Sequence, residues 1–208
     1  GFPWEGHYNP NPPFPCYEHN YAGQYRRNFV IGEEWKGKDI FLHIGSATSN
    51  VRVWINGIEV GYSEDSKLEA RFDITEYVNK GDNLIALEIF RWCDGTYLED
   101  QDFWRLTGIA RDIYIYSREK KRIEDVRIVA SASGKASIWA EVSKGVEKIS
   151  FDIMNASGEV TGSRALKIDN DNLSDRGLPQ VRININVPDV QTWSAETPNL
   201  YTLNVKVY

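Results

Sequence analysis

Short apolar runs recur along this chain about every ten residues, with turn-forming residues between them, a spacing typical of β-sandwiches and barrels. Residues 51–55 alternate apolar and polar side chains, as does a strand with one buried face. Asn56-Gly57 follows, the strongest short signal for a two-residue hairpin, and residues 58–62 return from it. Almost no segment has helical periodicity. This pattern predicts an all-β protein.

The first half of the chain predicts a jelly-roll sandwich. We expect a single helical turn at residues 75–78, because Thr-Glu-Tyr-Val there precedes the turn residues Lys80 to Asn83. The expected strands are 25–31, 39–44, 51–55, 58–62, 71–74, 84–90 and 111–116.

A strongly charged segment, residues 117–122, predicts a domain boundary, with one domain over 1–118 and a second over 119–208. The alternative, a solvated hairpin inside one sandwich, stays open. The second domain is expected to be an immunoglobulin-like β-sandwich, because its strand density suits that fold. Its expected strands are 123–130, 135–142, 148–154, 164–168, 181–187 and 200–208.

The N-terminal segment is rich in proline, with five of the eight prolines in the first fifteen residues. Proline lacks the N–H that a strand ladder needs and restricts the residue before it to extended geometry. We therefore expect an extended arm or a linker in residues 1–15 and no central strand.

Composition excludes several classes of protein. The net charge of −6 argues against a nucleic-acid partner or an anionic membrane surface, which would favour a basic face. No run of apolar residues approaches the length of a membrane-spanning helix. Cys16 and Cys93 lack metal-ligand spacing and are expected to be free thiols, although one disulfide bridge stays open. The chain begins at Gly1 without an initiator Met or signal region, which predicts a piece of a longer bacterial-type protein whose compartment, cytoplasmic or periplasmic, is open.

Residues 91–112 combine five carboxylates, three arginines, two tryptophans and a tyrosine in 22 residues. A buried strand would not carry so much charge, because unpaired buried charge is costly. A disordered segment would not carry so many aromatic side chains. The run predicts an ordered, polar, aromatic-lined surface of the kind that faces a sugar.

Five segments together resemble the N-terminal part of glycoside hydrolase family 2. They are Asn-Pro-Pro-Phe at 11–14, Tyr-Arg-Arg-Asn-Phe at 25–29, Val-Trp-Ile-Asn-Gly-Ile-Glu-Val-Gly-Tyr at 53–62, Asp-Gly-Thr-Tyr-Leu-Glu-Asp-Gln-Asp at 94–102, and Trp-Ser-Ala-Glu-Thr-Pro-Asn-Leu-Tyr at 193–201. The segment at 94–102 narrows the resemblance to the β-galactosidase branch. Residues 15–23 are only loosely similar to that family.

The resemblance implies a jelly-roll sugar-binding domain, then a β-sandwich, then a (β/α)₈ barrel beyond residue 208. The family's two catalytic glutamates lie in that barrel, so no catalytic residue is expected here and the chain alone is expected to be inactive. The implied parent is a retaining β-galactosidase acting on terminal β-D-galactosides, with the barrel as the chain's partner and a homo-oligomeric state. The alternatives are a free-standing carbohydrate-binding module and a family member acting on a glucuronide or mannoside.

The resemblance assigns two substrate-binding residues, Asp102 and Asn11. Asp102 would bind a galactose hydroxyl and a monovalent cation shared with the barrel, because carboxylate oxygens suit both ligands. The amide of Asn11 offers a donor and an acceptor to a sugar. No cofactor is expected on this chain alone, whereas Na⁺ and Mg²⁺ are expected in the full enzyme.

The other chemistry-bearing residues have structural interpretations. Autonomous hydrolysis by Glu99, Asp100 and Asp102 is disfavoured, because nothing in the sequence builds an enclosed pocket that would separate two carboxyl pKa values. Arginine matches carboxylates in two-point contacts, so ion pairs are expected to hold the loop. The expected pairs join Asp94, Glu99 and Asp100 to Arg91, Arg105 and Arg111, and the expected packing residues are Trp54, Trp92 and Trp104.

Overall fold

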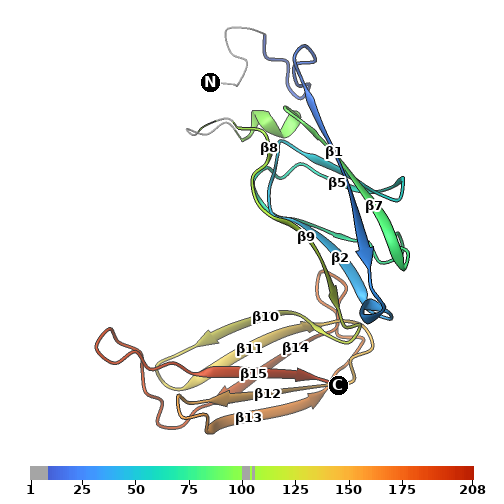
Figure 1. Cartoon of the computed structure of the whole chain (residues 1–208). Coiled ribbons are helices and arrows are strands. Elements are labelled where there is room, and N and C mark those ends of the chain that lie inside the picture. The colour runs from blue at the N-terminus through green and yellow to red at the C-terminus, as the bar shows by residue number, and fades with distance from the viewer. Residues whose placement is uncertain (1–8, 100–103, 105) are drawn as a thin grey trace. The chain divides into compact units, whose positions relative to one another are not determined.

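The computed structural model describes residues 9–99, 104 and 106–208, and it is built almost entirely of antiparallel strands (Figure 1). It divides into two compact units, Gly1–Glu119 and Lys120–Tyr208. The expected all-β sandwich architecture is confirmed. Among the described residues, no helix is long and apolar enough to cross a membrane.

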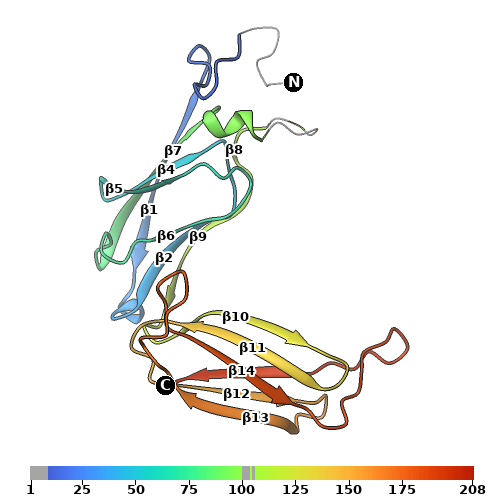
Figure 2. The same ribbon diagram turned by 180° about the vertical axis from the view of Figure 1, so that it is seen from behind.

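The first unit consists mainly of two sheets, with strand orders β1-β7-β4-β5 and β6-β2-β9 (Figure 2). A two-residue ladder, β3-β8, joins Ala47 to Ile109 and was not predicted. The elements are β1 (Ala22–Ile31), η1 (Glu33–Trp35), β2 (Asp39–Ile44), β3 (Ala47–Thr48), β4 (Val51–Ile55), β5 (Ile58–Ser63), β6 (Ala70–Asp73), β7 (Gly81–Phe90), η2 (Asp94–Tyr97), β8 (Gly108–Ile109) and β9 (Ile113–Arg118).

Alternating side chains make the core of this unit. Val51, Val53 and Ile55 of β4 are buried, while Arg52 between them is exposed, as a period of two requires. They pack in one cluster with apolar side chains of β2, including the fully buried Leu42. Each such side chain contributes about 1.5–3 kcal/mol of transfer free energy when it leaves water. The two sheets are therefore held face to face by their inner surfaces.

The predicted hairpin at Asn56-Gly57 is confirmed. Ile55 pairs with Ile58 across a two-residue turn, and both turn residues have positive φ, 52° at Asn56 and 85° at Gly57. This geometry suits the right-handed twist of the strands and explains the residue types. The Asn56 side chain also accepts a hydrogen bond from the Leu84 N–H at 2.9 Å, which ties the turn to β7.

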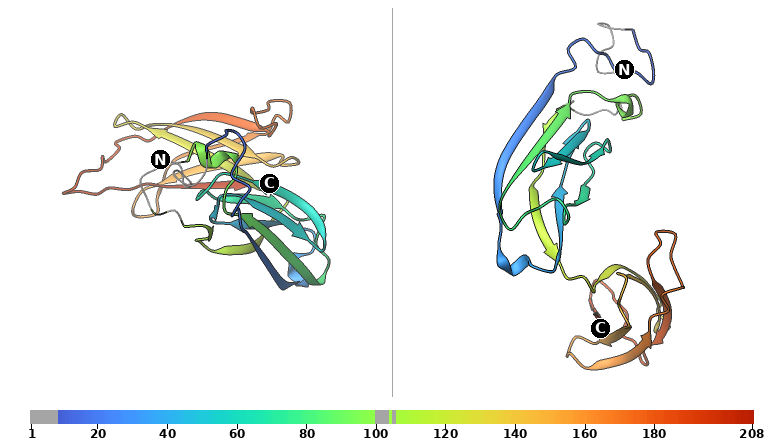
Figure 3. Two further views of the ribbon diagram at one scale, coloured as in Figure 1. Left: turned by 90° about the horizontal axis from the view of Figure 1, so that it is seen from above. Right: turned by 90° about the vertical axis from the view of Figure 1, so that its right-hand side faces the viewer.

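The second unit is a sandwich of two three-stranded sheets, β10-β11-β14 and β13-β12-β15. Its strands wrap around a common interior in the right-hand view of Figure 3. The elements are β10 (Ile123–Ala130), β11 (Lys135–Val142), β12 (Lys148–Met154), β13 (Val160–Lys167), β14 (Gln180–Asn186) and β15 (Thr202–Val207).

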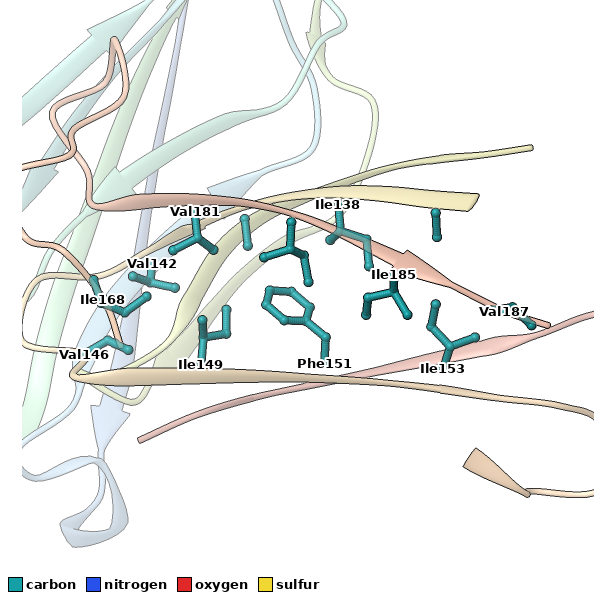
Figure 4. Close-up of a cluster of buried hydrophobic side chains, with 13 residues drawn as sticks. Ile138, Val142, Val146, Ile149, Phe151, Ile153, Ile168, Val181, Ile185 and Val187 are labelled. Carbon is teal, nitrogen blue, oxygen red and sulfur yellow. The ribbon is translucent and has the colours of Figure 1, made fainter. Parts of the chain in front are cut away.

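The core of the second unit is centred on Phe151, which is fully buried. Figure 4 shows its ring between the two sheets, with Ile149 and Ile153 beside it on β12 and Ile138 and Ile185 opposite. The spacing of these three β12 residues follows the strand period, so one face of the strand enters the core as a unit.

Several strand boundaries differ from the prediction. β13 begins at Val160 rather than 164, β7 begins at Gly81 rather than 84, and β9 begins at Ile113 rather than 111. The first residues of β13 and of β7 include polar residues and glycine, so a search for apolar runs places the beginning of both strands too late. The expected helical turn at 75–78 is a single turn closed by the Tyr77 N–H to the Ile74 carbonyl at 3.0 Å.

Candidate functional site

The N-terminal arm turns back on itself at residues 11–14, within the segment that was expected to be an extended arm or a linker. The Phe14 N–H donates to the Asn11 carbonyl at 2.9 Å, and the two residues form an isolated bridge. Pro12 and Pro13 occupy the corner between them. Because proline has no N–H to satisfy and a fixed φ, two prolines suit a tight corner better than a strand.

Tyr97, the last residue of η2, holds this turn in place. Its hydroxyl accepts a hydrogen bond from the Asn11 N–H at 3.0 Å and donates one to the Phe14 carbonyl at 2.9 Å. The contacts span more than eighty residues of sequence, and they place the arm against the beginning of the segment 91–112. Sequence reasoning did not assign Tyr97 a role. A tyrosine in a polar turn, with an apolar ring and a polar tip, is the signal that could have identified it.

Asn20 fastens the other end of the arm. Its side-chain amide donates to the Trp92 carbonyl at 3.1 Å and accepts from the Trp92 N–H at 2.9 Å. The Arg91 N–H also donates to the Tyr21 carbonyl at 2.9 Å, continuing the β1–β7 pairing by one step. Asn20 thus imitates a backbone pairing partner, a role that the sequence did not reveal.

The η2 turn rests on a buried N-terminal cap. The Cys93 N–H donates to the Thr96 hydroxyl at 3.0 Å, and the Thr96 N–H donates to the Cys93 carbonyl at 3.1 Å. The Cys93 thiol is buried and donates to the Ser49 carbonyl at 3.7 Å. Both cysteines of the chain carry free thiols.

A small acidic cluster lies beside η2. The ligand-type atoms of Glu64, Cys93 and Asp94 lie within 4.8 Å of one another, and the Tyr62 hydroxyl donates a hydrogen bond to the Glu64 carboxyl group. Burial raises the pKa of Glu64, hydrogen bonding and repulsion from Asp94 raise it further, and the hydrogen bond from Tyr62 opposes the increase. Burial and the neighbouring Glu64 carboxyl group raise the pKa of Tyr62. Glu64 and Tyr62 therefore hold their protons to a higher pH than the same side chains in water.

Glu99 and the arginines of the run have other partners than expected. Glu99 accepts a hydrogen bond from the Ser66 N–H at 3.1 Å, and Arg111 donates to the Lys67 carbonyl at 3.1 Å. Both contacts hold the loop between β5 and β6. Among the described residues, no ion pair joins Arg91 or Arg111 to Asp94 or Glu99, so that part of the pairing prediction is wrong. Glu99 and Arg111 instead bind backbone groups of this loop.

The two tryptophans of the run differ. Trp92 is only 6% exposed and packs under the guanidinium of Arg91, whose central carbon lies 4.7 Å from the ring. This agrees with a packing role. Trp104 is 84% exposed, so the expectation that it packs is wrong. Trp54 is half-buried on β4.

Of the predicted substrate-binding residues, Asn11 lies in the arm turn and is exposed. Its backbone N–H and carbonyl are both hydrogen-bonded, and its side-chain amide has no hydrogen bond within the part of the chain that the structure describes. Asp102, also the predicted cation ligand, lies outside the described residues, as do Asp100 and Arg105. An exposed amide on an anchored turn can donate to and accept from a polar ligand such as a sugar hydroxyl.

Comparison with known proteins follows the division into two units. Residues 9–119 match the glycosyl hydrolases family 2 sugar binding domain, and residues 121–208 match a second domain described as glycosyl hydrolases family 2. The beta-galactosidase of Priestia megaterium is 38% identical over 97% of this chain, and that of Clostridium acetobutylicum is 32% identical over 99%. The chain spans 20% and 23% of the lengths of these two proteins.

Solved structures show the same fold. A beta-glucuronidase from Bifidobacterium dentium superposes with a TM-score of 0.69 at 17% identity, over 90% of this chain and 36% of that one. A glycosyl hydrolase family 2 member from Bacteroides cellulosilyticus DSM 14838 gives a TM-score of 0.69 at 21% identity, over 90% of this chain and 26% of that one. At these identities the likeness concerns the fold alone. The two matched domains together account for nearly the whole sequence, and the chain belongs to glycosyl hydrolase family 2.

Proposed function

We propose that this chain is the substrate-binding, non-catalytic part of a retaining β-galactosidase that hydrolyses terminal β-D-galactosides. The observation that carries the proposal is its 38% identity, over 97% of its length, to a protein named beta-galactosidase. The bond-breaking carboxylates would come from a (β/α)₈ barrel that these 208 residues do not include. In this arrangement the chain supplies sugar contacts at the edge of the barrel's pocket.

The described geometry favours a non-catalytic role. Retaining hydrolysis needs two carboxyl groups roughly 5–5.5 Å apart, one ionised as nucleophile and one protonated as acid, with the glycosidic bond between them. Glu64 and Asp94 are close enough, but Glu64 is held by Tyr62 and the buried Cys93 thiol lies beside both. The Glu64 carboxyl group is thus already engaged by a neighbouring side chain, whereas Asp94 beside it is exposed.

Asn11 and Asp102 are the proposed sugar contacts on this chain. The support for Asn11 is its exposed amide on a turn that Tyr97 anchors. The support for Asp102 is the segment Leu-Glu-Asp-Gln-Asp, which resembles the family's sugar-binding run. A carboxylate is a strong acceptor for sugar hydroxyls and a suitable ligand for a hard cation. The cation contact of Asp102 stays a prediction of the sequence.

Substrate class is tested in the intact enzyme with nitrophenyl β-galactoside, β-glucuronide and β-mannoside. The proposal predicts that kcat/KM is highest for the galactoside, because two relatives at 38% and 32% identity carry that name. A preference for the glucuronide or mannoside would contradict it and favour the same family acting on another sugar.

The free-standing alternative is tested by calorimetry with galactose on the 208-residue chain. We expect weak or absent binding, because half of the pocket would belong to the barrel. Submicromolar affinity would favour a carbohydrate-binding module that acts alone. The same chain is expected not to cleave nitrophenyl β-galactoside.

A further inference from the structure

The arm between Asn11 and Tyr21 is fastened at both ends to one segment, residues 91–97. Asn20 and Tyr21 hold its C-terminal end on Arg91 and Trp92. Tyr97 holds its N-terminal end. An exposed loop anchored at both ends has far fewer conformations than a free one, and ordering it costs correspondingly less when a ligand binds.

The contact at Tyr97 acts on the backbone of Asn11 itself. Its hydroxyl accepts a hydrogen bond from the Asn11 N–H and donates one to the Phe14 carbonyl. A single phenol therefore closes the open side of the Asn11–Phe14 turn. A tyrosine hydroxyl has one proton to donate, and here that proton is committed to the turn. Once the backbone is fixed, the Asn11 side chain retains only its own rotamer freedom.

Hydrogen bonds close the η2 turn beneath Tyr97 at both ends. The η2 turn is closed at its start by reciprocal bonds between Cys93 and Thr96, and Cys93 is only 5% exposed. The Leu98 N–H donates to the Gly95 carbonyl at 2.9 Å and closes its end. Tyr97 thus projects from a turn that is hydrogen-bonded at both ends and begins at a buried residue, and a position held this way is more precise than one on a free loop.

We propose that Tyr97 is a positioning residue, which sets the orientation of Asn11 toward the sugar without touching the sugar itself. This inference rests on the proposed function, in which Asn11 contacts substrate. Misplacing a substrate-contacting group by about 1 Å can cost up to a hundredfold in rate. Removing the Tyr97 hydroxyl frees the turn while leaving the aromatic ring in place.

The first test concerns the anchor alone. Hydrogen exchange of the Asn11 amide is measured in the 208-residue chain and in its Tyr97→Phe variant, with Tyr17→Phe as control, because Tyr17 is an exposed tyrosine on the same arm. We expect Tyr97→Phe to speed exchange roughly tenfold, as loss of a hydrogen bond of about 1.4 kcal/mol would. Tyr17→Phe should leave the rate unchanged. Equal exchange in all three would overturn the inference.

The second test is a double-mutant cycle on kcat/KM in the intact enzyme. Tyr97→Phe should lower kcat/KM roughly tenfold in the wild-type background and have no further effect in Asn11→Ala, because Tyr97 acts through Asn11. Additive losses would show that Tyr97 acts by another route and would overturn the inference. If Asn11→Ala leaves kcat/KM unchanged while exchange in Tyr97→Phe is fast, the anchor exists but the sugar contact of Asn11 is wrong, and the positioning role fails with it.

Discussion

Burial sets the chemistry of single side chains in this protein, and Cys93 shows the effect most simply. Its thiol is 5% exposed, and burial raises its pKa. The reactive form of a cysteine is the thiolate, so a raised pKa and low exposure both slow alkylation. Cys16, which is partly exposed, is the internal control.

We therefore expect iodoacetamide at neutral pH to label Cys16 in the folded chain and to label Cys93 only after unfolding. Peptide mass spectrometry of the labelled protein distinguishes the two. Equal labelling rates at both cysteines in the folded chain would show that Cys93 is not enclosed as described.

Glu64 gives stability a pH dependence. Its pKa is raised in the folded state by burial and by Asp94, so the folded state prefers the protonated carboxyl. That contribution is fully present below the unfolded-state pKa and is lost as pH rises through the higher folded-state pKa. Glu64→Gln stays neutral and keeps an acceptor for the Tyr62 hydroxyl.

The expected outcome is a higher Tm for Glu64→Gln than for wild type at pH 8, and a difference that disappears below about pH 4. Calorimetric Tm values across this range measure it. Asp65→Asn, a neighbouring exposed carboxyl, is the matched control and should show no such trend. A Tm of Glu64→Gln below that of wild type at pH 8 would contradict the assigned pKa direction.

Residue contacts in the site were the least predictable part of the molecule. Tyr97 and Asn20 reach partners more than seventy residues away, and nothing in the local pattern names those partners. The same holds for Glu99, which was expected to pair with an arginine and instead accepts from a backbone N–H. Local patterns predict conformation, whereas these contacts depend on how the strands assemble.

Elements were more predictable, because side-chain alternation and turn chemistry are local. The β4–β5 hairpin follows from Asn56-Gly57 and the apolar period of its strands. The two-residue strands β3 and β8 have no such pattern and were missed. Residues 1–15 were expected to be an extended arm or a linker because prolines disfavour ladders, but two prolines suit a corner equally well, and the Phe14 N–H closes it on the Asn11 carbonyl.

Gly134 fixes the turn between β10 and β11. Its φ is +83°, its carbonyl accepts from the Val187 N–H at 2.8 Å, and an added Cβ would lie 2.1 Å from the Val187 carbonyl oxygen. Gly145 has a similar φ of +87° with nothing within 4 Å of such a Cβ. Comparing alanine variants at Gly134 and Gly145 therefore separates the cost of a steric clash from the cost of backbone strain.

Gly134→Ala should therefore reduce the free energy of unfolding by clearly more than 1 kcal/mol, and Gly145→Ala by about 1 kcal/mol. Urea unfolding of the two variants measures both changes. Equal losses would show that the backbone at Val187 gives way without cost.

At the scale of the whole molecule, two separate cores hold two units. The second unit is organised around Phe151, which is fully buried between its sheets. A sandwich of this size was predictable from strand density, whereas the order of strands in each sheet was not, because register depends on contacts between distant runs.

Phe151→Ala should destabilise the second unit by about 3–5 kcal/mol, the sum of lost transfer free energy and a residual cavity. Val160→Ala on exposed β13 is the control and should change the stability by less than about 0.5 kcal/mol. Denaturant unfolding followed by tryptophan fluorescence, to which Trp139 on β11 of this unit contributes, measures the change. A loss below about 1 kcal/mol for Phe151→Ala would show that the core collapses around the gap.

The most direct test of the proposed sugar-binding role is the hydrolysis of nitrophenyl β-galactoside by the intact enzyme carrying Asp102→Ala, compared with Asp112→Ala in the same charged run. If Asp102 contacts the sugar, kcat/KM falls by about tenfold or more in the first variant and stays at the wild-type value in the second. Wild-type kinetics in both variants would contradict the proposal that this chain contributes Asp102 to the substrate site.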